Sequence, residues 1–221
     1  MKIANANIYT GDDYIVNIAV ISGKEGTGKT TIAKALTELA IDVIKMDCGA
    51  CKLVCPQNFI KLSDEKKADT SVEIEDEGSK DLITHLRKNG KEFNDDEKLT
   101  ITDGTPGVGC PAISIITGSD AVLVVTEPTK PDLQDLMRVV ALCEFFGVFT
   151  MVCINKYDIN EEVAREIENF VNYKGFKLVG KIPYDDTVMK SINEVKPITC
   201  YKESTAQKAI EEMWSNIKNY M

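Results

Sequence analysis

Two lysines and several glycines stand close together in the segment VISGKEGTGKTTIAKAL, residues 20–36. Gly23, four further residues, and then Gly28, Lys29 and Thr30 follow the spacing of a phosphate-binding loop, or P-loop. Glycines at these places let backbone N–H groups curve around phosphate oxygens, and the start of a helix adds a partial positive charge. Lys29 is predicted to reach the β- and γ-phosphates of a nucleotide, and the Thr30 hydroxyl to bind Mg²⁺.

The elements that must position this loop alternate between apolar, β-rich runs and helical patterns. A strand is predicted over 15–21, before the loop, and a helix over 30–40, after it. Further strands are predicted at 42–46, 99–103, 121–126, 149–155 and 176–180, and further helices at 80–88, 131–146, 160–172 and 205–220. This alternation, with continuous apolar strands, predicts one α/β domain over residues 1–221. Its mainly parallel sheet of about seven strands is flanked by helices on both faces, with ligands at the carboxyl ends of the strands.

Composition and charge argue against several classes of partner. The chain has 221 residues and a formal net charge of −9, with no basic stripe, so nucleic acid is not expected as a partner. No run approaches the roughly 18 apolar residues of a membrane span, and the N-terminal residues lack the features of a signal peptide. A cytoplasmic protein is expected. The last helix has one apolar face and a mixed Lys and Glu face, which predicts docking on the sheet rather than on a membrane.

The loop GKEGTGKT resembles the deviant GKGGxGK[ST] loop of the MinD/ParA/Mrp ATPases and of the nitrogenase iron protein. The resemblance implies that Lys24 reaches across a dimer interface to the nucleotide of a partner subunit, which makes dimerisation depend on bound nucleotide. Glu25 stands where the family has Gly and adds a negative charge near the phosphates. The loop residues implied to contact ATP are Gly23, Glu25, Gly26, Thr27, Gly28, Lys29, Thr30 and Thr31.

The second half of the chain contains the segments DGTPGVGCP, VTEPT, INKYD and KIPYD. It resembles one subgroup of the MinD superfamily, the ATPases with an inserted ferredoxin domain, and the likeness is strong over residues 99–200. Asp103 at a strand end is expected to hold Mg²⁺ through water, and the Gly107 N–H to bond the γ-phosphate. The resemblance also implies that Asn155 meets the adenine and that the backbone around Pro183 lines the base pocket.

Two features leave the nucleotide chemistry open. Residues 155–158, NKYD, also fit the guanine-reading NKxD motif of GTPases, although the chain has D-x-x-P-G in place of the GTPase DxxG, and ATP is favoured. Relatives show D-x-D at the end of the second strand, whereas this chain has Asp47 and then Gly49 in place of the Asp that orients the attacking water. The residues expected to act on the phosphates are therefore Lys24, Lys29, Asp47 and Asp103. Either hydrolysis is slow or another carboxylate serves.

Cysteines follow the second strand in the run Cys48-x2-Cys51-x3-Cys55-Pro56. The run resembles the last three cysteines of a ferredoxin motif, and residues 48–81 form a cysteine-bearing, acidic insertion in place of a ferredoxin domain. Three thiolates need a fourth ligand to hold an Fe–S cluster or Zn²⁺, drawn from Cys110, Cys200, water or a partner subunit. The alternative is an inert remnant. Cys110 follows Asp103 at the interval of the cluster-bridging cysteine of the nitrogenase iron protein, or it is a small buried residue.

The leading hypothesis is a slow ATPase that works as a nucleotide-dependent dimer switch. It would form a homodimer, or a heterodimer with a ferredoxin-bearing relative, and would serve a metalloenzyme client through metallocentre or Fe–S assembly or nucleotide-gated electron transfer. A second hypothesis is a weakly hydrolysing nucleotide-binding partner of such a relative, favoured by Gly49 and Glu25. A third is a GTPase, favoured by residues 155–158 alone.

Overall fold

The computed structural model describes residues 16–40, 43–47 and 99–221. Its strands form one sheet in the order β2-β3-β1-β4-β5-β6, and every neighbouring pair is parallel. The strands are β1 (Val16–Ser22), β2 (Val43–Asp47), β3 (Leu99–Pro106), β4 (Ala121–Thr126), β5 (Phe149–Asn155) and β6 (Lys177–Ile182). The parallel α/β sheet is thus confirmed, with six strands in the described residues where about seven were predicted.

Four of the described α-helices lie between strands along the chain, and the other two, α7 and α8, follow the last strand, β6. The helices are α1 (Lys29–Leu39), α4 (Cys110–Thr117), α5 (Lys130–Phe146), α6 (Glu161–Lys174), α7 (Asp186–Asn193) and α8 (Thr205–Lys218), with short 3₁₀ turns at Tyr157–Ile159 and Ile198–Cys200. The helix predicted at 80–88 lies outside the described residues, and two of the observed helices, α4 and α7, were not predicted. Each has only eight residues. The apolar run in α4 is so short that its periodicity cannot distinguish a helix from a strand.

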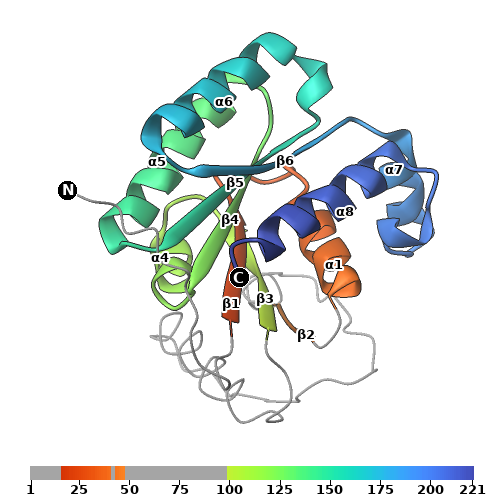
Figure 1. Cartoon of the computed structure of the whole chain (residues 1–221), viewed down its shortest axis with the longest axis horizontal. Coiled ribbons are helices and arrows are strands. Elements are labelled where there is room, and N and C mark those ends of the chain that lie inside the picture. The colour runs from red at the N-terminus through yellow and green to blue at the C-terminus, as the bar shows by residue number, and fades with distance from the viewer. Residues whose placement is uncertain (1–15, 41–42, 48–98) are drawn as a thin grey trace, which may run out of the picture.

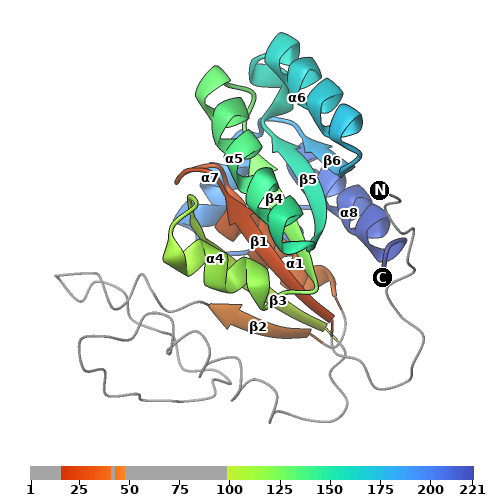
Figure 2. The same ribbon diagram turned by 90° about the vertical axis from the view of Figure 1, so that its left-hand side faces the viewer.

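Apolar side chains cover both faces of the sheet, as expected for parallel strands. Neighbouring residues of one strand point to opposite faces: Ile18 and Val20 belong to one core, and Ala19 and Ile21 to the other. Helices α1 and α8 cover the first face, and α4, α5 and α6 cover the second (Figures 1 and 2). The sheet is therefore the middle of three layers.

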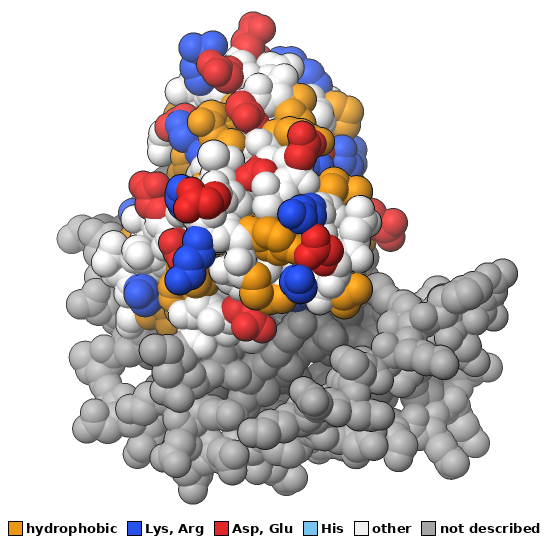
Figure 3. Space-filling model, turned by 90° about the vertical axis from the view of Figure 1, so that its right-hand side faces the viewer, with side chains coloured by type: hydrophobic (Ala, Val, Ile, Leu, Met, Phe, Trp, Pro, Cys, Tyr) orange, Lys and Arg blue, Asp and Glu red, His pale blue; other side chains and the backbone are white. Residues whose placement is uncertain are grey.

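The last helix docks on the sheet as predicted. Residues Ala206, Ile210, Met213, Trp214 and Ile217 are buried along one side of α8. Gly180 of β6 makes room for it, because a Cβ at that glycine would lie 2.8 Å from Met213 Cβ. No helix in the described part of the chain is long and apolar enough to cross a membrane. Acidic and basic side chains are interspersed over the face drawn in Figure 3.

The strand order brings several loops to one edge. Strand β1 lies between β3 and β4, so the segments that follow these three strands meet where the sheet's carboxyl ends lie. Beside them are the residues that follow β5 and β6. A crevice at such an edge is where open α/β sheets bind ligands.

Candidate nucleotide-binding site

The loop between β1 and α1 is built on glycines that no other residue replaces easily. Gly26 and Gly28 have φ values of 80° and 86°, in the left-handed region that side chains disfavour. A Cβ on Gly28 would also overlap Asn155 Nδ2, and one on Gly23 would overlap Asp135 Cβ. The loop is therefore pressed against α5 on one side and against the end of β5 on the other.

The start of α1 is a set of free hydrogen-bond donors. The first N–H to bond within the helix is that of Ile32, which donates to Gly28 O at 3.0 Å, so the N–H groups of Lys29, Thr30 and Thr31 precede the helical ladder. No side chain caps this end, and its first turn holds no acidic residue. Side chains of Thr129, Asn160, Asp185 and Ser204 cap α5, α6, α7 and α8.

An uncapped helix start that follows a glycine loop fits an anion such as a nucleotide phosphate. Lys29 is half-buried at the first position of α1 and Thr30 is exposed next to it. Glu25 is exposed in the loop. The other described helix without a side-chain cap is α4, which begins after Gly109 at the same edge.

Two aspartates lie at matching positions of neighbouring strands. Asp47 of β2 is the register partner of Asp103 of β3, which in turn is paired with Val20 of β1. Asp47 is the last residue of β2, whereas Asp103 lies three residues before the end of β3, which runs on to Pro106 beyond the strand end predicted at Asp103. The Asp103 carboxylate, on the strand beside the P-loop strand, is of a kind that suits a Mg²⁺ ion held through water.

The segment after β3 is already tied to the P-loop strand. Gly107 has a φ of 87°, and its N–H donates to Ser22 O at 2.8 Å. The predicted bond from this N–H to a γ-phosphate would therefore require the contact with Ser22 to break. A segment that exchanges one such bond for another can respond to the state of a nucleotide.

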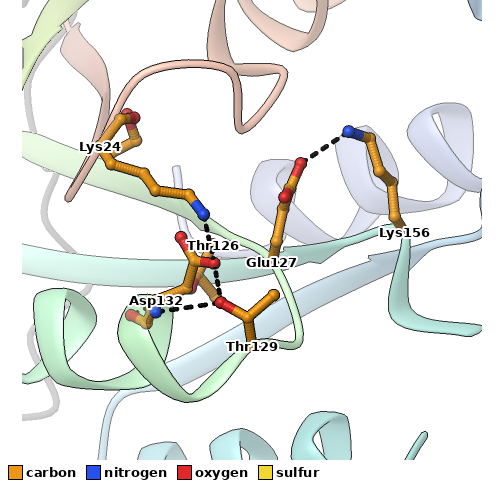
Figure 4. A network of polar contacts seen from close by, with 7 residues as sticks. Lys24, Thr126, Glu127, Thr129, Asp132 and Lys156 are labelled. Atoms are coloured by element: carbon orange, nitrogen blue, oxygen red, sulfur yellow. Dashed lines mark hydrogen bonds and ion pairs between the residues drawn. The ribbon is translucent and has the colours of Figure 1, made fainter. Parts of the chain in front are cut away.

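Lys24 contacts Asp132, a residue that was not predicted at the site. Its Nζ lies 2.8 Å from Asp132 Oδ2 at the start of α5 (Figure 4). The pKa of Lys24 is raised, first by this hydrogen bond, against the opposing effect of partial burial, and then by the negative charges of Asp132, Glu127 and Asp135. Thr129-x-x-Asp132 has the [ST]-x-x-[DE] spacing of a helix start, a signal that could have identified Asp132.

The end of β5 is connected to the P-loop through Asn155. Its Nδ2 donates to Thr27 O at 2.9 Å, and its Oδ1 accepts from the N–H of Lys156 at 3.1 Å. Lys156 has a φ of 53° and forms an ion pair with Glu127 at 2.7 Å (Figure 4). Glu127 was not predicted at the site, and Lys156 entered only as part of the alternative NKxD motif. The Asn155 amide group thus joins the P-loop to the residue that follows β5.

The neighbouring loop after β6 approaches the same end of β5. Pro183 is half-buried there, and the N–H of Tyr184 donates to Asp158 Oδ1 at 2.7 Å. Asp158 is the last residue of the NKxD pattern. One oxygen that a guanine reader needs as an acceptor is therefore bonded to the protein backbone.

The described cysteines divide into two pairs. Cys143 and Cys153 are buried in the core, and burial raises their thiol pKa values to about 11 and about 12. Cys110, at the first position of α4, and Cys200 are exposed. The alternative prediction that Cys110 is a small buried residue is therefore wrong. Part of the predicted metal site, Cys48, Cys51 and Cys55, lies outside the described residues, as do Gly49 and the rest of the insertion at 48–81. Within the described residues there is no group of three or more His, Cys, Asp or Glu side chains that could hold a metal ion.

Solved structures share this fold. The MinD cell division protein of Aquifex aeolicus is 20% identical, with a TM-score of 0.65 over 92% of this chain and 97% of that one. The septum site-determining protein MinD of Pyrococcus horikoshii, solved as a complex with Mg-ADP, is 21% identical, with a TM-score of 0.65 over 92% and 96% of the two chains.

Two curated relatives come from Methanocaldococcus jannaschii. An uncharacterised protein is 32% identical over 150 residues, which are 68% of this chain and 50% of that protein. The chain thus spans about half the length of this relative. An uncharacterised ATP-binding protein of the same organism is 25% identical over 90% of this chain and 86% of its own length.

Residues 18–198 match the CobQ/CobB/MinD/ParA nucleotide binding domain. That range contains the P-loop, Asp103, Gly107 and Asn155, and it covers most of the chain. The match agrees with the parallel sheet, the glycine loop and the uncapped start of α1. The chain belongs to the CobQ/CobB/MinD/ParA family of nucleotide-binding domains.

Proposed function

We propose that the chain binds ATP with Mg²⁺ at the P-loop and acts as a slow switch that controls the association of two subunits. The observation that carries the proposal is the start of α1, where uncapped N–H groups, left-handed glycines and Lys29 stand together. The name of the M. jannaschii ATP-binding relative and the Mg-ADP complex of the P. horikoshii protein support the choice of ligand.

Each residue of the site has a separate task in this proposal. The N–H groups of residues 26–31 and the Lys29 ammonium bind phosphate oxygens. The Thr30 hydroxyl and Asp103 hold Mg²⁺, which neutralises charge between the β- and γ-phosphates. Lys24 contacts the nucleotide of the second subunit, so two phosphate-bearing faces attract instead of repelling one another.

The base site favours adenine over guanine. A GTPase Asp accepts hydrogen bonds from two guanine nitrogens, whereas Asp158 Oδ1 accepts from the Tyr184 backbone. The Asn155 amide group, beside the P-loop, and the backbone near Pro183 suit an adenine edge. We therefore place ATP ahead of GTP.

Slow turnover follows from the end of β2. Asp47 is register partner to Asp103, but Gly49 stands in the place of the residue that orients water in relatives. The second candidate function, a nucleotide-binding partner that barely hydrolyses ATP, is favoured by this same substitution. Both candidates require ATP binding and differ only in turnover.

The client we propose is a metallocentre or an Fe–S system. The run Cys48, Cys51 and Cys55 follows β2 directly, and Cys110 is exposed at the start of α4 on the nucleotide edge. The cluster or Zn²⁺ would be completed by a second subunit or by a ferredoxin-bearing relative. Anaerobic protein should then carry metal that a Cys51→Ser variant loses.

Calorimetric titration with ATP and with GTP tests the site. Wild-type protein with Mg²⁺ should bind ATP and should bind GTP at least tenfold more weakly. Lys29→Ala should lose ATP binding without loss of thermal stability. The control, Lys34→Ala, removes an exposed lysine one turn further along α1 and should bind ATP like the wild type. Equal ATP affinity in Lys29→Ala would overturn the assignment.

Light scattering with a non-hydrolysable ATP analogue tests the switch. The mass of the wild-type species should rise toward that of a dimer when analogue and Mg²⁺ are added. Lys24→Ala should weaken this rise more than it weakens nucleotide binding. An unchanged mass in the wild type would contradict the dimer switch but not the nucleotide site.

A further inference from the structure

The ammonium of Lys24 is held inside its own subunit. The Asp132 carboxylate that it contacts at 2.8 Å is 2% exposed, whereas the Lys24 side chain is 41% exposed. One partner of this ion pair is therefore fixed in the protein and the other reaches it from the surface. A buried carboxylate that loses its cation is costly, so the pair favours this position of the lysine.

Asp132 is fixed in place before the lysine reaches it. Its N–H donates to Thr129 Oγ1 at 3.2 Å, and the Thr129 hydroxyl donates to Asp132 Oδ2, so the two residues form the start of α5 (Figure 4). The same Oδ2 atom accepts from Lys24. The carboxylate thus presents a rigid acceptor toward the P-loop.

The backbone of Lys24 is fixed as well. Its carbonyl accepts from the Ser22 hydroxyl at 2.6 Å, and the preceding Gly23 is packed against Asp135 of α5. A change of partner at Lys24 therefore needs only new side-chain torsions. Such rotamer changes at the surface are fast and need no refolding of the loop.

Neighbouring acids are already paired with other cations. Glu127 forms its ion pair with Lys156, and Asp135 with Arg138 at 3.2 Å. Asp132 is thus the carboxylate that Lys24 neutralises in this conformation. Removal of the lysine to another subunit would leave Asp132 buried with the Thr129 hydroxyl as its remaining described side-chain donor.

We propose that Asp132 is a positioning residue that retains Lys24 within its own subunit and so opposes the association of two nucleotide-loaded subunits. The inference rests on the proposed function of Lys24. Association exchanges the Asp132 carboxylate for phosphate oxygens of the partner's nucleotide. The phosphates carry a larger negative charge than the Asp132 carboxylate, so the exchange goes forward only when nucleotide is bound. Asp132 thus sets how strongly the partner's nucleotide must attract Lys24 before two subunits associate.

The test compares Asp132→Asn with wild type in two measurements. Asparagine keeps an acceptor for Thr129 but removes the charge that holds Lys24. Without nucleotide, acylation of Lys24 by an amine-reactive reagent, followed by mass spectrometry, should become several times faster in Asp132→Asn. With the non-hydrolysable ATP analogue and Mg²⁺, the dimer dissociation constant from ultracentrifugation should fall about five- to tenfold.

Matched variants separate this effect from a general loss of negative charge. Glu144→Gln removes an exposed carboxylate near the other end of α5, one that pairs with Lys174, and should change neither measurement by more than about twofold. Adding Asp132→Asn to a Lys24→Ala protein should give no tighter dimer than Lys24→Ala alone. If Asp132→Asn does not fold, Asp132→Ser keeps a polar group at the start of the helix.

Each outcome has a definite meaning. Unchanged Lys24 acylation in Asp132→Asn overturns the positioning role. Faster acylation with an unchanged or weaker dimer overturns the opposition to association. If the proposed function is wrong, neither wild type nor Lys24→Ala will associate when nucleotide is added. If only this inference is wrong, wild type will associate with nucleotide, but Asp132→Asn will not strengthen that association.

Discussion

At the scale of single residues, the site depends on close approaches between segments far apart in the sequence. Asn155 bonds Thr27 O across a separation of 128 residues, and its Nδ2 occupies the space that a side chain on Gly28 would need. The end of β5 and the P-loop therefore hold one another in place. A base bound near β5 and a phosphate bound at α1 share this connection.

Gly28→Ala should destabilise the fold for two reasons. The left-handed φ of 86° costs an alanine about 1 kcal/mol, and overlap with Asn155 adds on the order of 1–2 kcal/mol. Gly147→Ala is the control, because its φ is 69° but an added Cβ meets nothing within 4 Å. Urea denaturation should show the larger loss for Gly28→Ala. Equal losses would mean that Asn155 moves aside freely.

At the scale of elements, α7 ends on a strained residue. Val195 follows the last turn with a φ of 54°, and the N–H of Lys196 donates back to Ser191 O at 2.9 Å, the pattern that usually has glycine at this position. Val195 is 91% exposed, so its side chain contributes almost no packing in the subunit. The strain is therefore uncompensated by burial.

Val195→Gly should stabilise the protein by about 1 kcal/mol, because glycine adopts this conformation without the penalty of a β-branched side chain. Val195→Ala should recover less, since it keeps a Cβ. Chemical denaturation of the three proteins gives the comparison. A loss of stability in Val195→Gly would show that the valine side chain makes a contact that its exposure does not suggest.

The starts of α7 and α8 are joined by Asp185. Its carboxylate accepts from Thr187 N, Ser204 Oγ, Thr205 Oγ1 and Ala206 N at 2.8, 2.6, 3.1 and 3.2 Å. Burial acts to raise the pKa of Asp185, but these hydrogen bonds outweigh it and hold the pKa well below its usual range. The ionised form is thus bound more tightly in the folded protein than in the unfolded chain.

A depressed pKa makes this contribution depend on pH in one direction. Above the ordinary Asp pKa of about 3.9 it is fully present, and it is lost as pH falls from there toward the folded-state pKa, because the unfolded chain then binds more protons. Asp185→Asn should cost on the order of 1–2 kcal/mol at pH 7, limited by partial exposure, and less below about pH 4. Glu203→Gln, at a fully exposed residue, should change little at either pH.

At the scale of the whole molecule, α8 closes one side of the three-layer fold. Met213 is fully buried against Gly180 of β6, and α8 also packs beside α1, the helix that begins at the P-loop (Figure 1). The helix thus stabilises the layer that carries the phosphate-binding helix. Its own residues lie outside the proposed nucleotide site.

Met213→Ala should destabilise the protein by about 2–4 kcal/mol, since it leaves a cavity between α8 and the sheet. The matched control is Met189→Ala on α7, where the methionine is 55% exposed and the loss should stay below about 1 kcal/mol. Thermal or urea unfolding measures both. ATP affinity below the unfolding temperature should be unchanged in Met213→Ala, and a weakened affinity would show that α8 reaches the site through α1.

Sequence alone determined the local parts of this protein. The strand, glycine loop and helix over 16–39 follow from spacing and apolar periodicity, as do the limits of β4 and β5, which matched the predicted residues. The helix predicted from residue 160 is α6, and the side chain of Asn160 caps it by accepting from Val163 N. These features depend on neighbouring residues, so a local pattern suffices. The short helices α4 and α7 gave too little periodicity to be recognised.

Only the tertiary structure decided which of these parts meet. The pairing of Lys24 with Asp132, the bond from Asn155 to Thr27 and the bond from Tyr184 N to Asp158 all join segments that follow different strands. The first two depend on β4 and β5 lying next to β1 in that order, and the third depends on β6 lying beside β5. Apolar strands of similar composition are equally suited to several orders in a sheet. The order is set by how the helices pack over both faces, and that is a property of the folded chain as a whole.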